Sequence, residues 1–404
     1  VGDDDQSIYG WRGAKVGHLE DFKTKHKQNA TIRLEQNYRS TSIILNAANA
    51  LIENNQARLG KNLWTESNEG EQITLYQAFN EQDEARFVAE IIKSWMDGGE
   101  LFSDSAVIYR SNAQSRAIEE ALLRANIPYR IYGGLRFYDR LEIKNAISYL
   151  RIIFNPHDNP AFERSVANPT RGVGAKTLAK IRSLANKHNI SYIQASSKMI
   201  DENLISGRGA NGLKKFLEII LGLCGKIDDI SLSEIVGSIL EQSGLIQFHE
   251  KEPGEKGKTR KENLEELLSA AKNFEMSFSD DKTNREITEQ FLSNVSLDAG
   301  DRQADEFDDA VQLMTLHSAK GLEFPLVFMT GLEETLFPHG RSMESPDQLE
   351  EERRLCYVGI TRAMKKLYLT YAESRRLHGN DIFNPPSRFI NCLLYTSPSP
   401  RDIG

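Results

Sequence analysis

Three polar side chains in separate parts of the chain have the chemistry expected around a transferring phosphoryl group. Gln6 lies in a glycine-rich loop, Arg39 lies where a helix is expected to begin, and Arg362 lies in a helical pattern near residue 360. One well-placed arginine of this kind contributes about 10³–10⁵ in rate. The sequence contains no G-x-x-x-x-G-K-[ST] motif, so it offers part of a phosphate site, and we expect this chain alone not to hydrolyse ATP.

Arg39 follows an expected short strand at Thr31–Leu34 and precedes an amphipathic helix. The N-cap of that helix is expected at Ser40 or Thr41. Backbone N–H groups at a helix N-terminus already attract anions, so a guanidinium there is unfavourable unless an anion binds beside it. A phosphate is a suitable anion, and the neighbouring Tyr38 offers a ring that can stack on a base.

Two short apolar runs, Val311–Leu316 and Leu326–Thr330, predict buried strands on either side of a polar loop. The loop holds His317, Lys320 and Glu323. We expect these three at the carboxyl end of the first strand, because open α/β sheets place ligand-binding groups at that edge.

Arg362 is expected to share a helix face with apolar residues. The helix is predicted to begin near Asp347 with a capping box, and Leu355 and Val358 lie in its buried stripe. An arginine in register with an apolar face needs a negatively charged partner. Two partners remain open at this point, an internal carboxylate and a bound anion.

The elements that position these residues form an α/β pattern interrupted by helices. Strands and helices alternate from Ile73 to Tyr132, which predicts a parallel sheet with right-handed crossovers. From about Asp139 to Asp305 almost every segment predicts a helix, and the β/α pattern resumes at Val311. We therefore expect one α/β domain that is split by a long all-helical insertion.

A glycine-rich turn within this insertion has two interpretations. The run GVGAKT resembles a P-loop, but Ala175 stands in place of the glycine before the lysine, and no apolar strand precedes it. A helix–hairpin–helix turn at Gly172 and Gly174 fits better, since exposed N–H groups at the next helix can contact duplex phosphates. Arg171 and Thr177 would assist that contact. The alternative is an ordinary turn between packed helices.

A second polar loop, Gly2–Ala14, contains two aromatic residues and an arginine between glycines. Tyr9, Trp11 and Arg12 are suited to stacking on bases, which contributes about 1–3 kcal/mol per base. The alternative for Trp11 is that its ring fills a core.

The composition is that of a globular protein. The 404 residues are 39% hydrophobic and 27% charged, with a formal net charge of −8, which weakly disfavours a protein that simply coats nucleic acid. No signal peptide or membrane-spanning run is visible in the sequence. Cys224, Cys356 and Cys392 have neither disulfide-framework nor zinc-site spacing, so we expect a reducing, cytoplasmic setting.

Four of these segments together resemble a known family. GDDDQSIYGWRGA, LEQNYRST, MTLHSAKGLEF and EEERRLCYVGITRA are similar, in this order, to motifs III to VI of the superfamily 1A DNA helicases, the UvrD/PcrA/Rep family. The linking sequence looks most like the UvrD branch, and the resemblance covers Val1–Asn391. Residues 392–404 look like a translated sequencing adapter, which we interpret as a scar outside the fold.

The resemblance implies two RecA-like motor domains, each with an inserted domain. On that template residues 1–35 end the first motor domain (1A), residues 36–138 and 306–391 form the second (2A), and residues 139–305 form the helical 2B insertion. ATP and Mg²⁺ are expected between the motor domains, with the Mg²⁺ ligands N-terminal to this chain. The implied activity is ATP-dependent 3′→5′ DNA unwinding in repair and replication, in the cytoplasm at the nucleoid.

The resemblance also implies roles for five residues around the nucleotide. Gln6 is expected to sense the γ-phosphate, which Arg39 and Arg362 would clamp. Tyr38 is expected to stack on adenine, and Glu323 to bond the ribose.

The residues implied in DNA contact come from several segments. They are Tyr9, Trp11 and Arg12 on the bases, Arg110, Asn112 and His317 on the same single strand, and Gly172, Gly174 and Thr177 with Arg171 on the duplex. His378 stands where relatives carry Tyr or Phe on a strand-separating hairpin, and an imidazole stacks less well than a phenol ring. The implied partners are single-stranded DNA, the junction with duplex DNA and repair proteins, without a membrane.

Two other functions remain open from the sequence. One is a DNA-binding module without catalysis, which the absent P-loop favours. The other is the helicase subunit of a helicase–nuclease of the AddA/RecB kind, which requires a nuclease domain after motif VI.

Overall fold

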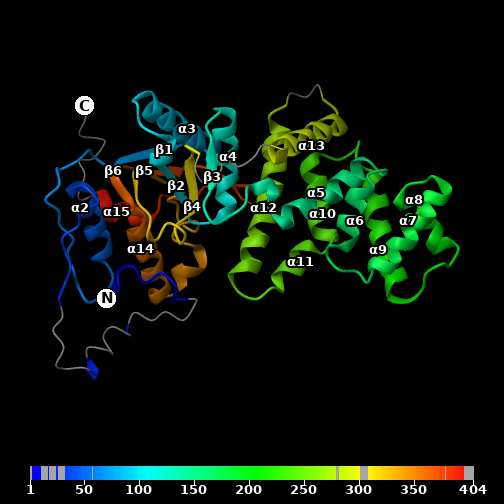
Figure 1. Cartoon of the computed structure of the whole chain (residues 1–404), viewed down its shortest axis with the longest axis horizontal. Coiled ribbons are helices and arrows are strands. Elements are labelled where there is room, and N and C mark those ends of the chain that lie inside the picture. The colour runs from blue at the N-terminus through cyan, green and yellow to red at the C-terminus, as the bar shows by residue number, and fades with distance from the viewer. Residues whose placement is uncertain are drawn as a thin grey trace. The chain divides into compact units, whose positions relative to one another are not determined.

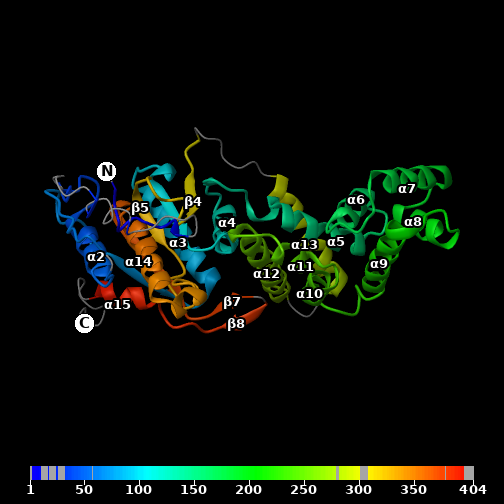
Figure 2. The same ribbon diagram turned by 90° about the horizontal axis from the view of Figure 1, so that it is seen from below.

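The computed structural model describes residues 2–10, 17, 24–25, 32–56, 58–278, 282–300, 308–377 and 379–394. The chain divides into two compact units, which are described separately (Figures 1 and 2). The first unit comprises Val1–Gly134, Gln303–Arg375 and Asp381–Gly404, and the second comprises Leu135–Arg302 and Arg376–Asn380.

The first unit is built on a six-stranded parallel sheet with the strand order β1-β6-β5-β2-β4-β3. Its strands are β1 (Thr74–Ala78), β2 (Ser105–Tyr109), β3 (Tyr129–Ile131), β4 (Val311–Thr315), β5 (Phe324–Met329) and β6 (Ala363–Ala372). The expected α/β class and the parallel sheet are confirmed. This mixed α/β architecture is consistent with a RecA-like fold.

Helices cover both faces of the sheet, because successive side chains of each strand point to opposite sides. In β2, Ala106 and Ile108 pack into one apolar core, whereas Val107 and Tyr109 pack into another. The first core is closed by α2 (Ser42–Ile52), α14 (Pro346–Ile360) and α15 (Arg388–Leu394). The second is closed by α3 (Glu81–Asp97) and α4 (Ser115–Arg124), which lie together in Figure 1.

One expectation about this unit is wrong. The described residues 32–34 of the expected strand Thr31–Leu34 are extended but unpaired, with Ile32 and Leu34 exposed, and the nearest pairing is a single bridge from Gln36 to Trp64. The scar expected at residues 392–404 stays a prediction. Helix α15 continues to Leu394, because its apolar face packs into the first core.

The described part of the second unit consists of helices joined by loops, together with residues 376–377 and 380 of a small β-hairpin. Its helices are α5 (Leu141–Phe154), α6 (Asn159–Ala167), α7 (Ala175–His188), α8 (Tyr192–Asp201), α9 (Gly207–Cys224), α10 (Leu232–Gln242), α11 (Leu245–Glu250), α12 (Glu255–Met276) and α13 (Asn284–Gly300). In the described part of the chain, no helix is both long enough and apolar enough to cross a bilayer. The expectation that this insertion is the family's 2B domain stays a prediction.

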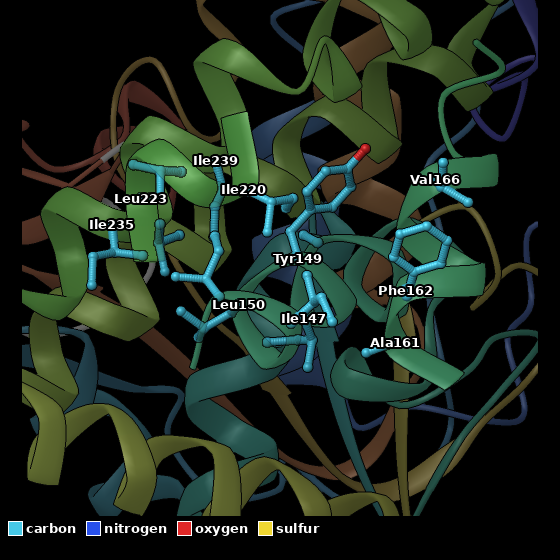
Figure 3. Close-up of a cluster of buried hydrophobic side chains, with 14 of the residues drawn as sticks. Ile147, Tyr149, Leu150, Ala161, Phe162, Val166, Ile220, Leu223, Ile235 and Ile239 are labelled. Atoms are coloured by element: carbon cyan, nitrogen blue, oxygen red, sulfur yellow. The ribbon is translucent and has the colours of Figure 1, made fainter. Parts of the chain in front are cut away.

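Helix α5 is the centre of the helical unit. Ten of its fourteen residues are buried, because it is apolar around most of its circumference and packs against α6, α9, α10 and α12. Tyr149 and Leu150 of α5 meet Phe162 of α6 and Ile220 of α9 in one core (Figure 3). This core does not depend on the sheet of the first unit.

We predict that Ile220→Ala lowers the stability of the helical unit by about 2–5 kcal/mol, because Ile220 is fully buried and alanine leaves a cavity. The adjacent Leu221 lies on the same helix but is about half exposed, so Leu221→Ala serves as the control. Native-state hydrogen exchange of the α5 amides measures both. Equal effects of the two substitutions would contradict the assigned core.

Candidate nucleotide and DNA sites

Arg39 lies two residues before the N-cap of α2, in a turn fixed by the Asn37 side chain. That side chain accepts the backbone N–H groups of Arg39 and Ser40 at 2.8 and 2.9 Å. Arg39 Nε donates to Glu323 Oε2 at 2.5 Å, and Arg39 Nη1 donates to the carbonyl oxygen of Thr361 at 3.3 Å. The expected helix start is confirmed, with the N-cap at Thr41.

Arg362 does not belong to the helix that precedes it. Helix α14 ends at Ile360, and its N-cap is Ser345 without a side-chain cap, so the expected capping box at Asp347 is wrong. The guanidinium of Arg362 is only 2% exposed. It donates to the carbonyl oxygens of Val358 and Leu322 and to the Thr361 hydroxyl at 2.9, 3.0 and 3.0 Å.

These partners are not carboxylates, so the interpretation of Arg362 as half of an internal ion pair finds no support in its hydrogen bonds. The cation instead lies at the C-terminal end of α14, where the last carbonyl groups favour positive charge. Burial and the neighbouring charge of Arg39 lower the pKa of Arg362 to about 10. The two guanidinium groups both bond Thr361 and repel each other, so together they form a positively charged cluster that would favour an anion beside it.

Gln6 is linked to the Arg39–Arg362 cluster through its contacts with Asp3 and Lys320. Its Nε2 donates to Asp3 Oδ2 at 2.7 Å, and its carbonyl oxygen accepts from Lys320 Nζ at 2.8 Å. The negative charge of Asp3 in turn acts on Arg362. Lys320 therefore holds the loop of residues 2–10 against the loop that follows β4.

The loop after β4 connects opposite edges of the sheet. His317 follows β4 at the carboxyl edge, whereas Glu323 directly precedes Phe324, the first residue of β5. Since β4 and β5 run parallel, the chain must return to the amino edge before β5 begins. The expectation that Glu323 shares the carboxyl edge with His317 is therefore wrong. Glu323 lies at the amino edge with Arg39 and Arg362.

Four of the residues expected to contact single-stranded DNA are described. The Tyr9 hydroxyl donates to the His317 carbonyl oxygen at 3.3 Å, and the two rings lie 6.2 Å apart. Arg110 directly follows β2, which pairs with β4, and Asn112 begins the next turn. The structure thus brings these four residues to the carboxyl edge. Trp11, Arg12 and His378 lie outside the described residues.

Arg110 is held by a buried carboxylate. Its Nε and Nη2 donate to Glu352, with a shortest distance of 2.7 Å, and the His339 backbone N–H donates to the same carboxylate. Burial alone would raise the pKa of Glu352, but the charge and hydrogen bonds of Arg110 outweigh burial, so the pKa is lowered. The guanidinium is therefore fixed in one orientation at the sheet edge.

The glycine-rich turn of the helical unit connects α6 to α7, as a helix–hairpin–helix requires. Gly172 has a φ of +80°, which favours glycine. Gly174 is the N-cap of α7 and provides no side chain to cap its first N–H groups, although the Thr177 N–H donates to the Gly174 carbonyl oxygen at 3.0 Å. Arg171 has an internal role: its guanidinium donates to the carbonyl oxygens of Pro169 and Ser243 at 2.8 and 2.5 Å.

Sequence reasoning missed a second glycine-rich segment that supports this turn. It contains Gly209 and Gly212 at the start of α9. A Cβ atom at Gly212 would lie 1.9 Å from the Arg171 carbonyl oxygen, and one at Gly209 would lie 3.0 Å from that of Gly172. The backbone of α9 therefore rests directly against the turn, and the repeated glycines of SGRGANG were the available signal.

Three consecutive acidic residues, Asp3, Asp4 and Asp5, have ligand oxygens within 4.8 Å of one another. Each is already bonded, however. Asp3 pairs with Lys61, Asp4 accepts the Leu59 backbone N–H at 2.6 Å, and Asp5 pairs with Arg58 at 2.9 Å. We assign no metal site to these residues.

Two family models match the chain. The UvrD-like helicase C-terminal domain matches residues 32–374, and the UvrD/REP helicase N-terminal domain matches residues 1–27. Because the first match covers most of the chain, the chain belongs to the UvrD-like helicase family.

Several bacterial helicases are similar to this chain. DNA helicase II of Escherichia coli strain K12 is 54% identical over 393 residues, which are 97% of this chain and 54% of the relative. DNA helicase II of Haemophilus influenzae is 53% identical, over 96% of this chain and 53% of the relative. The ATP-dependent DNA helicase PcrA of Bacillus subtilis is 47% identical, over 96% and 53%. The chain spans about half the length of the curated relatives it matches.

We predict that Glu352→Gln removes a pH-dependent part of the stability. Because folding lowers the pKa of Glu352, its stabilisation is fully present above the unfolded pKa of about 4.3 and is lost as pH falls through the lower folded value. The Tm of the variant should therefore lie below that of the wild type at pH 7, and the difference should shrink toward pH 3. Glu344→Gln, at a nearby exposed position, is the control, and a Tm difference that stays constant with pH would contradict the assignment.

Proposed function

We propose that this chain supplies the second motor domain and the duplex-contacting domain of an ATP-driven DNA helicase that moves 3′→5′ along single-stranded DNA. The observation that carries the proposal is the convergence of Arg39 and Arg362 on Thr361. The names of its relatives, DNA helicase II and ATP-dependent DNA helicase PcrA, support it.

The nucleotide would bind where the two guanidinium groups meet. They would neutralise charge on the transferring phosphoryl group, with Gln6 reaching the same group through the loop of residues 2–10. The half-exposed carboxylate of Glu323 forms an ion pair with Arg39. An ion pair this exposed contributes at most about 1 kcal/mol. Phosphate oxygens therefore compete easily for Arg39, which leaves the Glu323 carboxylate to accept ribose hydroxyls.

The exposed ring of Tyr38, directly beside Arg39, would stack on the adenine. The remaining parts of the site, a P-loop and the Mg²⁺ ligands, are assigned to a first motor domain, since Asp3, Asp4 and Asp5 are already bonded. Hydrolysis then requires the two motor domains to close around ATP, which couples the chemistry to movement.

DNA would bind at the opposite, carboxyl edge of the sheet. The loop from His317 to Glu323 links the two edges, and Lys320 joins it to Gln6 and lies 5.3 Å from the Tyr9 ring centroid. A shift of this loop on nucleotide binding would therefore move residues at both sites. The N-terminus of α7 would contact phosphates of the duplex ahead. Single-stranded DNA next to duplex is the proposed substrate, repair proteins are the proposed partners, and the cytoplasm is the proposed location.

Joining the chain to the first motor domain of E. coli DNA helicase II tests whether the site is divided in this way. We expect DNA-stimulated ATPase activity in the joined protein and none in this chain alone, because the P-loop comes from the added domain. Phosphate release in the presence and absence of single-stranded DNA measures both. Activity of the chain by itself would contradict the divided site, and inactivity of the folded joined protein would favour a non-catalytic DNA-binding module.

In the joined protein, we predict that Arg362→Ala lowers kcat for ATP by about 10³-fold or more, because the transition-state charge loses a buried cation. The affinity for single-stranded DNA should stay within a few-fold of the wild type, since the DNA residues lie at the other edge of the sheet. Lys365→Ala removes an exposed cation three residues away and should change neither quantity. Parallel loss of ATPase activity and DNA binding in Arg362→Ala would refute the separation of the two sites.

A further inference from the structure

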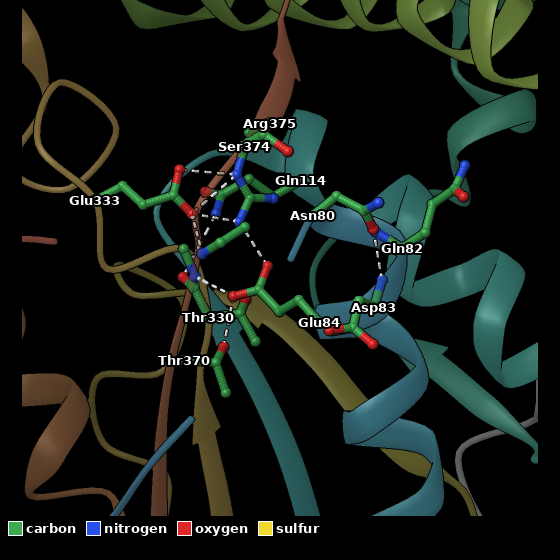
Figure 4. A network of polar contacts seen from close by, with 12 residues as sticks. Asn80, Gln82, Asp83, Glu84, Gln114, Thr330, Glu333, Thr370, Ser374 and Arg375 are labelled. Carbon is green, nitrogen blue, oxygen red and sulfur yellow. Dashed lines mark hydrogen bonds and ion pairs between the residues drawn. The ribbon is translucent and has the colours of Figure 1, made fainter. Parts of the chain in front are cut away.

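A buried charged cluster lies beyond the carboxyl ends of β1, β5 and β6 (Figure 4). It consists of Glu84, Glu333 and Arg375, which are 2%, 0% and 6% exposed. Arg375 Nη2 donates to Glu84 at 2.6 Å and to Glu333 at 2.6 Å, and its Nε donates to both oxygens of Glu333 at 3.1 Å. We call these three residues the hairpin clamp.

The clamp holds two carboxylates against one guanidinium, and its surroundings stabilise the extra negative charge. Glu84 lies in the first turn of α3, where the helix dipole favours an anion. It also accepts the Gly331 backbone N–H at 2.9 Å and the Thr370 hydroxyl at 2.5 Å. Burial alone would lower the pKa of Arg375, but the two carboxylates raise it well above its usual value, so the clamp stays ionised.

Arg375 is the first residue of a small hairpin formed by β7 (Arg375–Leu377) and β8 (Asn380–Ile382). The chain that enters the hairpin is held by the clamp and by the end of β1. The Ala372 backbone N–H donates to Glu333 Oε1 at 2.9 Å, and the Glu373 backbone N–H donates to the Ala78 carbonyl oxygen at 2.8 Å. One leg of the hairpin is thereby fixed to the sheet.

The chain that leaves the hairpin returns to the same point. Glu333 forms a backbone bridge with Pro386, and the Glu334 N–H donates to the Pro385 carbonyl oxygen at 3.0 Å. The Ser387 N–H donates to the Leu332 carbonyl oxygen at 2.8 Å. Glu333 is therefore the residue where both legs meet, through its side chain on one leg and its backbone on the other.

Strand β6 connects the clamp to the candidate nucleotide site. Arg362 directly precedes the strand, and Arg375 follows its end by three residues. The ten residues of β6 span about 33 Å and pair with β1 on one side and β5 on the other. The pairing with β5 covers Ala363–Leu369 and the pairing with β1 covers Tyr368–Ala372, so β6 is hydrogen-bonded to a neighbour from its first residue to its last. A strand held in this way is stiff, and a displacement at Arg362 would be carried to the base of the hairpin.

We propose that Arg375, held by Glu84 and Glu333, is a positioning residue that fixes the β7–β8 hairpin for duplex separation and transmits the movement of the nucleotide site to it. The role in duplex separation rests on the proposed function, whereas the fixing of the hairpin does not. Replacing a buried charged cluster by apolar residues is often neutral for stability, so we assign the clamp a role in fixing the chain at residues 372–375, where the hairpin begins.

The first test measures the hairpin in this chain, without nucleotide or DNA. Arg375→Lys keeps the charge but removes the fork that reaches both carboxylates, so β7–β8 amides should exchange about tenfold faster or more, with β2 and β5 unchanged. Arg388→Lys breaks a similar fork on the adjacent Glu334 and should leave the hairpin amides unchanged. Unchanged exchange in Arg375→Lys, or equal loosening of the whole sheet, would overturn the proposal.

Arg375→Lys leaves three charged side chains in the core and could prevent folding, so Glu333→Gln provides a second variant. It keeps an acceptor oxygen for the Ala372 N–H. It also retains Arg375 and Glu84 as a pair without net charge. We expect the same selective loosening of the hairpin. If this folded variant exchanges like the wild type, the Arg375–Glu333 contact does not hold the hairpin, and the proposal fails.

The second test uses the chain joined to a first motor domain. Arg375→Lys should lower the rate of duplex unwinding about tenfold or more while DNA-stimulated kcat and KM for ATP stay within about twofold, whereas Arg388→Lys should change none of them. If unwinding and ATPase activity fell together in Arg375→Lys, the clamp would only stabilise the fold, and the proposal would be overturned. Absence of unwinding in the wild-type joined protein would instead refute the proposed function, and the exchange result would still decide whether the clamp fixes the hairpin.

Discussion

The candidate nucleotide site depends on two arginines that are held close together at the amino edge of the sheet. Arg39 and Arg362 both bond Thr361, and the charge of the first contributes to the lowered pKa of the second. The carbonyl oxygens of Val358 in α14 and of Leu322 in the loop before β5 accept from Arg362 and hold it in place without neutralising it. Arg39 is paired with the half-exposed Glu323, and in the proposed function the oxygens of a triphosphate would take over from this carboxylate and compensate both cations.

The parallel sheet separates the residues proposed to bind nucleotide from those proposed to bind DNA. In a parallel sheet every strand has its amino end at one edge and its carboxyl end at the other. Arg362 and Glu323 precede their strands, whereas Arg110 and His317 follow theirs, so the two groups lie at opposite edges. Communication between the edges must then run through the strands or through a loop that crosses from one edge to the other, and β6 and the loop after β4 are such connections.

Local pattern was enough to predict the strands of the sheet, the helices α2, α3, α4 and α14 on its faces and the all-helical segment, because apolar periodicity is a local property. It did not predict α15. Local pattern was not enough to predict which residues pair with the charged side chains. Arg110 and Glu352 are 242 positions apart, and the partners of Arg375 lie 42 and 291 positions away. The edge occupied by Glu323 depended on the direction of β5, and the carbonyl partners of Arg362 depended on where α14 ends. Both are properties of the assembled sheet.

The ion pairs of the first unit differ in burial, and burial determines what each can do. Breaking a buried pair leaves a charge without water, so the Arg375 clamp persists as a fixed part of the fold. The Arg39–Glu323 pair has a half-exposed carboxylate, and water compensates for its loss. The proposed function uses both kinds, because exchangeable contacts would accept and release nucleotide while fixed contacts would carry the resulting displacement. Their distribution along β6, with the exchangeable pair near its start and the clamp beyond its end, is the order that such a transmission requires.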